Sequence, residues 1–246
     1  MAAVKERDPA MLAETMENWL RKEIARAGAR GGIVGLSGGI DSALVAVLLK
    51  NVFGSDMLTV YLPVHSMEQD REDALVMVKT FDLPYREVDL SPLYDNFLRS
   101  LGEEKITPLA AANIKPRLRM TALYALAQSE NLLVCGTGNR PERYLGYFTK
   151  YGDGGADLLP LGDLLKSEVR SVSRYLGIPE PLIEKAPSAG LWTGQTDEEE
   201  MGMSYDVIDG YLAEGKGDDT ITERIERMHT LTEHKRSMPP VCLFRR

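Results

Sequence analysis

Cysteine is scarce in this chain, which has only two, Cys135 and Cys242, among 246 residues. No Cys-x-x-Cys pair occurs, so the sequence predicts neither a zinc site nor a redox pair, and each cysteine is expected to behave as a small apolar residue. No apolar run is long enough to cross a bilayer, and the N-terminal residues contain no apolar stretch of the signal-peptide kind. We therefore expect a cytoplasmic protein without a membrane partner.

Positive charge is also in deficit, with 29 Lys and Arg against 37 Asp and Glu and a formal net charge of −8. This balance argues against a broad nucleic-acid-binding surface, so no nucleic-acid partner is expected. Hydrophobic residues make up 43% of the chain, enough for a sizeable core. Neither a linker nor an internal repeat is visible, and we expect one domain over residues 1–246.

Apolar runs and helical periodicities alternate along the chain. A helix is predicted from Pro9 to Gly28, with Asp8 as its N-cap. Further helices are predicted over residues 43–49, 69–81, 113–128, 163–176, 198–212 and 218–230, and strands over 32–34, 57–62, 84–88 and 132–135. This order predicts an α/β fold, a doubly wound and mostly parallel Rossmann-like sheet with helices on both faces. Ligands of such sheets bind at the carboxyl ends of the strands.

The segment from Gly35 to Ser42, which reads Gly-Leu-Ser-Gly-Gly-Ile-Asp-Ser, follows the first predicted strand and opens an apolar helix. Backbone N–H groups at a helix start attract anions, and two adjacent glycines, Gly38 and Gly39, let the backbone approach closely. Ser37 and Ser42 add hydroxyl donors. No Gly-Lys-Ser/Thr follows, so this is not a Walker A loop. The simpler alternative is an ordinary turn between a strand and a helix.

Asp41 places a carboxylate inside this expected phosphate cradle. Carboxylate and phosphate repel each other unless a cation lies between them, and Mg²⁺ commonly bridges the two. The pattern Ser-Gly-Gly-x-Asp-Ser resembles the pyrophosphate loop of enzymes that adenylate a substrate and release pyrophosphate. The sequence thus predicts a Mg²⁺-dependent ATP site here.

Further segments follow in an order that resembles one family. They are residues 113–120, 136–139, 146–157, 160–161, 166, 185–189, 194–198 and 234–236. In this order, together with the glycine loop, the chain is similar to NAD⁺ synthetases over about residues 8–240. The block from Phe148 to Asp157 is the most specific part, because it separates this family from other pyrophosphate-loop enzymes. The resemblance implies an adenine nucleotide alpha hydrolase-like fold.

The resemblance also implies a ligase reaction that forms a C–N bond, the last step of NAD⁺ biosynthesis. ATP adenylates the nicotinate carboxylate of deamido-NAD⁺, and pyrophosphate leaves. Ammonia then attacks the acyl adenylate, which gives NAD⁺ and AMP. The physical requirements are charge neutralisation on the phosphates, two aligned nucleotides and exclusion of water.

Residue roles follow from the resemblance position by position. ATP binding falls on Gly35, Leu36, Ser37, Gly38, Gly39, Ile40, Asp41, Ser42, Thr137, Lys166 and Ser188. Of these, Ser37, Asp41 and Lys166 are the implied catalytic residues, and Asp41 and Glu142 the implied Mg²⁺ ligands. Contacts to deamido-NAD⁺ fall on Arg117, Lys150, Asp157, His234 and Lys235.

Taken one at a time, these residues have plainer interpretations. The lysines and arginines could be solvated surface charges, Glu142 an ordinary loop acid, and residues 234–236 a frayed basic terminus. Asp153 and Asp157 could bond their own turn. The chain also departs from the family pattern at Pro116 and at Arg140-Pro141, and it has Ser188 where threonine also occurs.

The nitrogen source is expected to be free ammonia, or ammonia from a separate protein. About thirty residues precede the first predicted strand and contain no cysteine, so no N-terminal glutaminase (nitrilase-like) domain is expected. The resemblance implies a homodimer with substrate near the subunit interface, to which Leu118, Ala122 and Leu126 could contribute. We also expect residues 186–197 to close over the bound ligands.

Other functions stay open from the residues alone. One is a different adenylating enzyme of the amidotransferase type, and a weaker one is a tRNA-thiolating relative, for which catalytic cysteines and a basic surface are missing. A third is a non-catalytic ATP-binding module. Such a module would not need Asp41, Glu142 and Lys166 around a leaving pyrophosphate. Pyrophosphate exchange with ATP would separate these classes.

Overall fold

A four-stranded parallel sheet lies at the centre of the fold, in the order β3-β2-β1-β4. The computed structural model describes residues 7–102, 105–188, 196–215 and 217–244. The strands are β1 (Gly31–Gly35), β2 (Leu58–Tyr61), β3 (Tyr85–Glu87) and β4 (Leu132–Val134). In the register, Ile33 faces Leu58 on one side and Val134 on the other. The parallel sheet expected from the sequence is confirmed.

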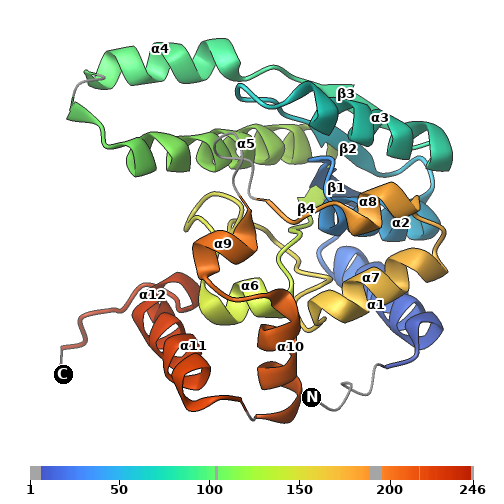
Figure 1. Cartoon of the computed structure of the whole chain (residues 1–246). Coiled ribbons are helices and arrows are strands. Elements are labelled where there is room, and N and C mark those ends of the chain that lie inside the picture. Colours follow the sequence, from blue (N-terminus) through green and yellow to red (C-terminus); the bar gives the residue numbers. More distant parts are fainter. Residues whose placement is uncertain (1–6, 103–104, 189–195, 216, 245–246) are drawn as a thin grey trace.

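Helices cover both faces of this sheet, as predicted (Figure 1). Successive strand residues point to opposite faces of the sheet, and each face carries its own hydrophobic core. Val34 belongs to the first core, which it shares with residues of α1 (Pro9–Arg26), α2 (Ile40–Phe53) and α7 (Lys166–Tyr175). Its neighbour Ile33 joins the second core, with α4 (Ser91–Leu101) and α5 (Pro108–Glu130). Helices α3 (Glu68–Phe81) and α8 (Glu180–Glu184) add to the first of these cores.

A smaller third core lies beyond the sheet, among helices of the C-terminal half. These are α6 (Arg140–Leu145), α9 (Asp197–Met201), α10 (Tyr205–Glu214) and α11 (Asp219–Leu231), followed by α12 (Glu233–Arg236). Leu145, Tyr205, Ile208 and Ile225 are fully buried in it. It packs next to the carboxyl end of β4, because α6 begins a few residues after that strand. This cluster brings residues 197–236 back toward the strand ends.

The limits of two predicted helices are wrong. The helix expected over 113–128 begins at Pro108, where the Thr107 hydroxyl accepts from the Ala110 N–H, and Pro116 lies inside it. The Thr107 cap thus determines where α5 begins, and the buried ring of Pro116 lies in the interior of that helix. The helix expected over 198–212 is divided into α9 and α10 at Gly202, whose φ is +66°.

Four of the described helices, α4, α6, α8 and α12, were not predicted at all. The expectation that residues 186–197 close over ligands falls mainly on residues 189–195, which lie outside the described residues. Leu118, Ala122 and Leu126, offered above as dimer contacts, are half-buried against the second core. No described helix is long and apolar enough to cross a membrane.

Gly38 is required by two independent constraints. Its φ is +79°, and a Cβ there would lie 2.5 Å from the backbone oxygen of Asp70 in α3. Gly38→Ala is therefore expected to lower the free energy of unfolding by about 1–3 kcal/mol, measured by urea denaturation. Gly210→Ala, in α10 with no heavy atom within 4 Å of its Cβ, is the matched control and should stabilise by about 0.5–1 kcal/mol. Equal stability of wild type and Gly38→Ala would contradict this constraint.

Candidate active site

The glycine loop connects the carboxyl end of β1 to the start of α2. Gly39 is the N-cap of α2, so the first N–H groups of that helix face the loop. The Ser42 hydroxyl accepts from the Ser37 N–H (3.1 Å), donates to the Gly39 carbonyl (2.9 Å) and lies 3.0 Å from the Ser37 hydroxyl. The two hydroxyls expected to meet phosphate therefore hold the loop together. The turn is thus held in shape by its own bonds, beside a helix start whose geometry suits an anion.

A buried ion pair joins this loop to α7. Lys166 Nζ lies 2.5 Å from Asp41 Oδ2 and 3.8 Å from Glu142 Oε1, and only 1% of the lysine side chain is exposed. The ammonium also stands 4.9 Å from the centre of the Tyr205 ring. Burial alone would lower the pKa of Lys166, but Asp41 and Glu142 raise it above its ordinary value. The structure thus assembles three of the predicted residues from three distant segments.

Asn139 fixes the two carboxylates relative to each other. Its side-chain amide donates to Asp41 Oδ1 (3.0 Å) and to Glu142 Oε1 (2.8 Å). It is also the N-cap of α6, where Glu142 at the third position returns a bond to the Asn139 N–H and completes a capping box. Arg140-Pro141, the departure from the family pattern, forms the first turn of this helix. That rigid pair therefore orients Glu142.

Lys166 is positioned by a carboxylate from the third core. Asp209 in α10 accepts from the backbone N–H groups of Lys166 (3.0 Å) and Ser167 (2.8 Å), at the start of α7. A carboxylate at a helix N-terminus stabilises that end of the helix. Asp209 is itself buried. Asp209 of α10 thus fixes the backbone of Lys166, while the Lys166 side chain extends to Asp41.

Two carboxyl groups, those of Asp41 and Glu142, face one lysine in this cluster. Burial, and next the neighbouring Asp41, raise the pKa of Glu142 to about 8. The described residues contain no group of three or more His, Cys, Asp or Glu side chains able to hold a metal ion by themselves. Two neighbouring carboxyl groups, one of which a cation would help to ionise, fit Mg²⁺, which takes its other ligands from water and phosphates.

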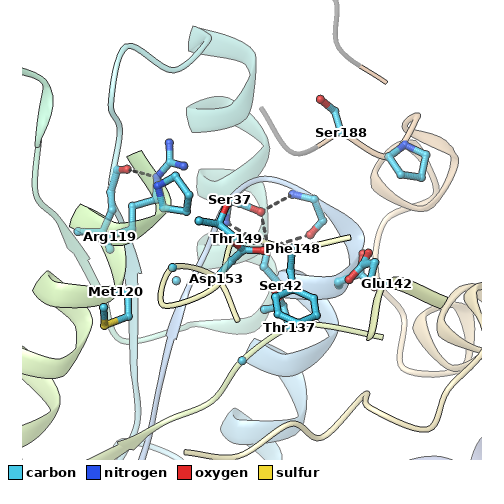
Figure 2. A pocket seen from close by; sticks show the side chains of 18 of the residues that line it. Ser37, Ser42, Arg119, Met120, Thr137, Glu142, Phe148, Thr149, Asp153 and Ser188 are labelled. Atoms are coloured by element: carbon cyan, nitrogen blue, oxygen red, sulfur yellow. Dashed lines mark hydrogen bonds between the residues drawn. The ribbon is translucent and has the colours of Figure 1, made fainter. Parts of the chain in front are cut away.

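A cavity of about 760 Å³ opens beside the loop, in the size range of small-molecule sites. Figure 2 shows Ser37 and Ser42 in its middle, with Glu142 and Ser188 on one side and Arg119 and Met120 on the other. Many of the predicted residues line it, namely Gly35, Leu36, Ser37, Gly39, Ile40, Asp41, Ser42, Thr137, Glu142, Ser188 and Lys235. Gly38 and Lys166 lie directly behind this lining.

Most of the predicted substrate contacts lie outside this lining. Arg117 is exposed and its Nε donates to the Lys150 carbonyl (3.3 Å), while Lys150 Nζ donates to the His234 carbonyl. Asp157 accepts from the Val134 N–H (2.8 Å) and the Tyr124 hydroxyl (3.0 Å). The structure brings Arg117, Lys150 and His234 together at the rim. Asp157 joins β4 to α5 in this structure.

Lys235 connects the C-terminal segment to the cavity. Its Nζ donates to the carbonyls of Gly146 (2.7 Å) and Phe148 (2.8 Å), directly after α6. It also stands over the Phe148 ring, 5.4 Å from the ring centre. The basic tail, which could have been a frayed terminus, is therefore packed against the family-specific segment 146–157.

Two residues of the site, Lys185 in the cavity lining and Tyr205 beside Glu142, received no role from the sequence. Lys185 bonds Asp70 (2.9 Å) and Asp73 (2.6 Å) of α3 and the Gly38 carbonyl (3.3 Å). Tyr205, fully buried, donates to Asp197 (3.1 Å). No local pattern identifies these residues, because each is defined by a partner distant in sequence. For Lys185, the adjoining Ala-Pro-Ser segment was the only available signal.

Glu142 predicts a dependence of stability on pH. The folded protein keeps the Glu142 proton up to about pH 8, whereas the unfolded chain releases it near pH 4.5. Between these values the unfolded state binds fewer protons, so the free energy of unfolding falls as pH rises. The glutamine of Glu142→Gln cannot ionise, so the free energy of unfolding of this variant does not fall with pH for this reason.

The variant should therefore gain about 1–3 kcal/mol relative to wild type between pH 5 and pH 8. Urea denaturation in EDTA, without nucleotide, measures this difference. Glu14→Gln, an exposed position on α1, serves as the control and should follow the wild-type curve. A pH-independent difference between Glu142→Gln and wild type would show that Glu142 is already ionised when folded.

Comparisons with known proteins place this chain in a family. The NAD synthase family matches residues 12–239. An NH(3)-dependent NAD(+) synthetase of Carboxydothermus hydrogenoformans is 50% identical over 236 residues, covering 94% of this chain and 96% of the relative. The solved structure of an NMN synthetase from Francisella tularensis has 39% identity and a TM-score of 0.93, and the match covers 97% of this chain and 100% of that one.

An NH3-dependent NAD synthetase from Campylobacter jejuni has 29% identity and a TM-score of 0.81, and the match covers 97% of this chain and 100% of that one. These matches extend over almost the whole chain and include every segment on which the resemblance was based. They confirm the family that the motifs predicted: the chain belongs to the NAD synthase family.

Proposed function

We propose that this chain is an ammonia-dependent NAD⁺ synthetase whose described residues form one catalytic domain. It amidates deamido-NAD⁺ with ATP and ammonia, and releases AMP and pyrophosphate. The observation that carries the proposal is the meeting of Asp41, Lys166 and Glu142 at the glycine loop, on one cavity. The family membership and the NH(3)-dependent relatives support it.

The reaction needs two displacements. A nicotinate carboxylate oxygen attacks the α-phosphorus of ATP, the bond to the β-phosphate oxygen breaks, and pyrophosphate leaves. Ammonia then attacks the acyl carbon, loses a proton, and expels AMP. Both steps are accelerated by fixed positive charge where negative charge develops on the phosphates.

In this proposal the glycine loop and the start of α2 hold the ATP phosphates. Ser37 and Ser42, which bond each other in this structure, turn their hydroxyls to phosphate oxygens, and Ser188 faces the phosphates from another side. Lys166, held by Asp209, donates to the phosphate that leaves. Thr137, at the carboxyl end of β4, contacts the nucleotide from the neighbouring strand.

Mg²⁺ would be held by Asp41 and Glu142, and Glu142 would release its proton when the ion binds. The ion, when bound, neutralises phosphate charge during departure of pyrophosphate. Asn139 would keep both carboxylates oriented toward it, as a partner that positions metal ligands.

Deamido-NAD⁺ would be bound by Arg117, Lys150, Asp157, His234 and Lys235. Since Arg117 is exposed at the rim, we place part of this substrate at a subunit interface of a homodimer. Leu93, Phe97 and Leu101 recur every fourth residue on α4 and are exposed, as is Leu109 at the start of α5. Such an apolar stripe is typical of a surface that a second subunit covers.

Ammonia would be the direct nitrogen donor. Burial raises the pKa of the Cys135 thiol to about 12, so this cavity residue is a poor nucleophile for glutamine hydrolysis. Cys242 is exposed in the C-terminal segment. A separate protein could deliver ammonia to the site without changing its chemistry.

A second candidate is amidation of the mononucleotide, nicotinate mononucleotide, to NMN. The specific observation is the structural match to an NMN synthetase, with a TM-score of 0.93. The same cluster of Asp41, Lys166 and Glu142 would serve both substrates, because the reacting carboxylate and ATP are shared. Only the contacts to the second nucleotide half would differ.

A product assay separates these activities. The protein is incubated with ATP, Mg²⁺ and ammonium and with deamido-NAD⁺ or nicotinate mononucleotide, and the products are separated by chromatography. We expect NAD⁺ and AMP from deamido-NAD⁺, a higher kcat/KM for it than for the mononucleotide, and no product when glutamine replaces ammonium. A kcat/KM higher for the mononucleotide would favour NMN synthesis, and amidation of neither would overturn the proposal.

Asp41→Asn tests the role of the ion pair. The change keeps shape but removes the charge that faces Lys166 and Mg²⁺, so kcat should fall by about a hundredfold or more at saturating Mg²⁺. The circular dichroism spectrum should stay that of the wild type. Asp56→Asn, exposed before β2, is the control and should keep full activity. Near-wild-type turnover of Asp41→Asn would refute the assignment.

A further inference from the structure

Three cationic side chains of the described residues line the cavity: Arg119, Lys185 and Lys235. Lys185 is neutralised by Asp70 and Asp73, both within 3 Å. Lys235 donates to two backbone carbonyls and is already proposed as a substrate contact. Arg119 has no role in the mechanism above, although it comes from the same helix as the predicted Arg117.

Arg119 is held by neutral groups only. Its Nε donates to the Leu62 carbonyl (2.9 Å), and its Nη2 donates to the Ser66 hydroxyl (3.3 Å). Across the described part of the chain, no carboxylate lies within ion-pair distance of it. A guanidinium has five N–H donors, so its remaining donors are available to a ligand in the cavity.

The location supports a ligand rather than a fortuitous charge. Leu62 and Ser66 follow β2, the strand next to β1, so Arg119 stands at the same sheet edge as the glycine loop. In Figure 2 it lies across the cavity from Glu142 and Ser188, on the side of Met120. It thus faces the glycine loop from the side opposite to Glu142, whose carboxylate lies 3.8 Å from Lys166 Nζ.

Desolvating a charge without an opposite charge is unfavourable, and burial lowers the pKa of Arg119. Arginine nevertheless stays charged in proteins. Arg119 is half-buried, its hydrogen-bond partners are neutral, and Asp70 and Asp153 oppose the effect of burial on its pKa only from beyond ion-pair distance. Such a cation is stabilised when an anion enters the site. Arginine is also the side chain whose planar fork matches phosphate oxygens with two parallel hydrogen bonds.

We propose that Arg119 binds a phosphate group of a nucleotide substrate through the outer N–H groups of its guanidinium. The proposal rests on the proposed function, since both ATP and the pyridine nucleotide carry such phosphates. Arg119 thereby supplies the cation on the side of the cavity that Lys166 does not reach. Arg117, two residues earlier, stays at the rim.

A purely structural role is the competing explanation, because Arg119 also bridges two positions of the segment between β2 and α3. The two roles differ in what they affect. A bridge contributes to stability and to both substrates alike, whereas a phosphate contact affects one nucleotide and depends on salt.

Binding without turnover tests the proposal. Isothermal titration calorimetry measures ATP alone and deamido-NAD⁺ alone, each with wild type, Arg119→Gln and Arg119→Lys. We expect Arg119→Gln to weaken one nucleotide at least tenfold and the other less than threefold, and Arg119→Lys to weaken the same one less. The nucleotide whose affinity falls is the one that carries the phosphate bound by Arg119. Affinity of wild type for that nucleotide should fall more steeply with KCl than that of Arg119→Gln.

Two controls complete the test. Ser66→Ala removes one bridge partner but keeps the cation, and should change both affinities less than threefold. Arg21→Gln, exposed on α1, removes a remote positive charge and should change nothing. If Arg119→Gln is unfolded by circular dichroism, Arg119→Lys decides: unchanged affinity for both nucleotides overturns the proposal.

Equal loss of both nucleotides, or a loss without altered salt dependence, also overturns it in favour of the structural bridge. These outcomes are separate from the proposed function. If the wild type forms no NAD⁺ in the product assay, the nucleotide-binding arms still show whether Arg119 contacts phosphate.

Discussion

The ion pair between Asp41 and Lys166 is the interaction on which the rest of the site depends. The lysine side chain is almost fully buried and lies 2.5 Å from the Asp41 carboxylate. A buried charge that loses its partner destabilises a protein by about 3–5 kcal/mol, so neither residue can change alone without consequence. The pair also connects α2, which follows the glycine loop, to α7, which Asp209 positions from α10. The third core thereby helps set the geometry of a site at the sheet edge.

Helix starts provide much of the site's precision. The glycine loop ends at the N-cap of α2, Asn139 caps α6 and orients Glu142, and Asp209 caps α7 beside Lys166. Asn139 and Asp209 satisfy N–H groups that α6 and α7 cannot satisfy themselves, whereas Gly39 makes no side-chain cap bond to the first N–H groups of α2. Catalytic groups on rigid helix termini lose little entropy when they bind substrate. The same arrangement concentrates positive electrostatic potential where phosphates are expected.

The parallel sheet and the glycine loop could be predicted because their signals are local: apolar runs, a Gly-Gly pair and alternating periods. The start of α5 could not, since Pro116 suggested a first turn while Thr107 caps the helix nine residues earlier. Lys185, Tyr205 and Arg119 were missed because their environments are set by distant partners. The motif order indicated Lys166 and Glu142, but only the fold shows that both surround Asp41.

The central claim is that this site joins a nicotinate carboxylate to the α-phosphorus of ATP. Transfer of ¹⁸O tests it most directly. Deamido-NAD⁺ labelled with ¹⁸O in its carboxylate is converted with ATP, Mg²⁺ and ammonium, and the AMP is analysed by mass spectrometry. Attack at the α-phosphorus places one ¹⁸O atom in the phosphate of each AMP. Unlabelled AMP with ¹⁸O in pyrophosphate would contradict it, because attack would then have occurred at the β-phosphorus.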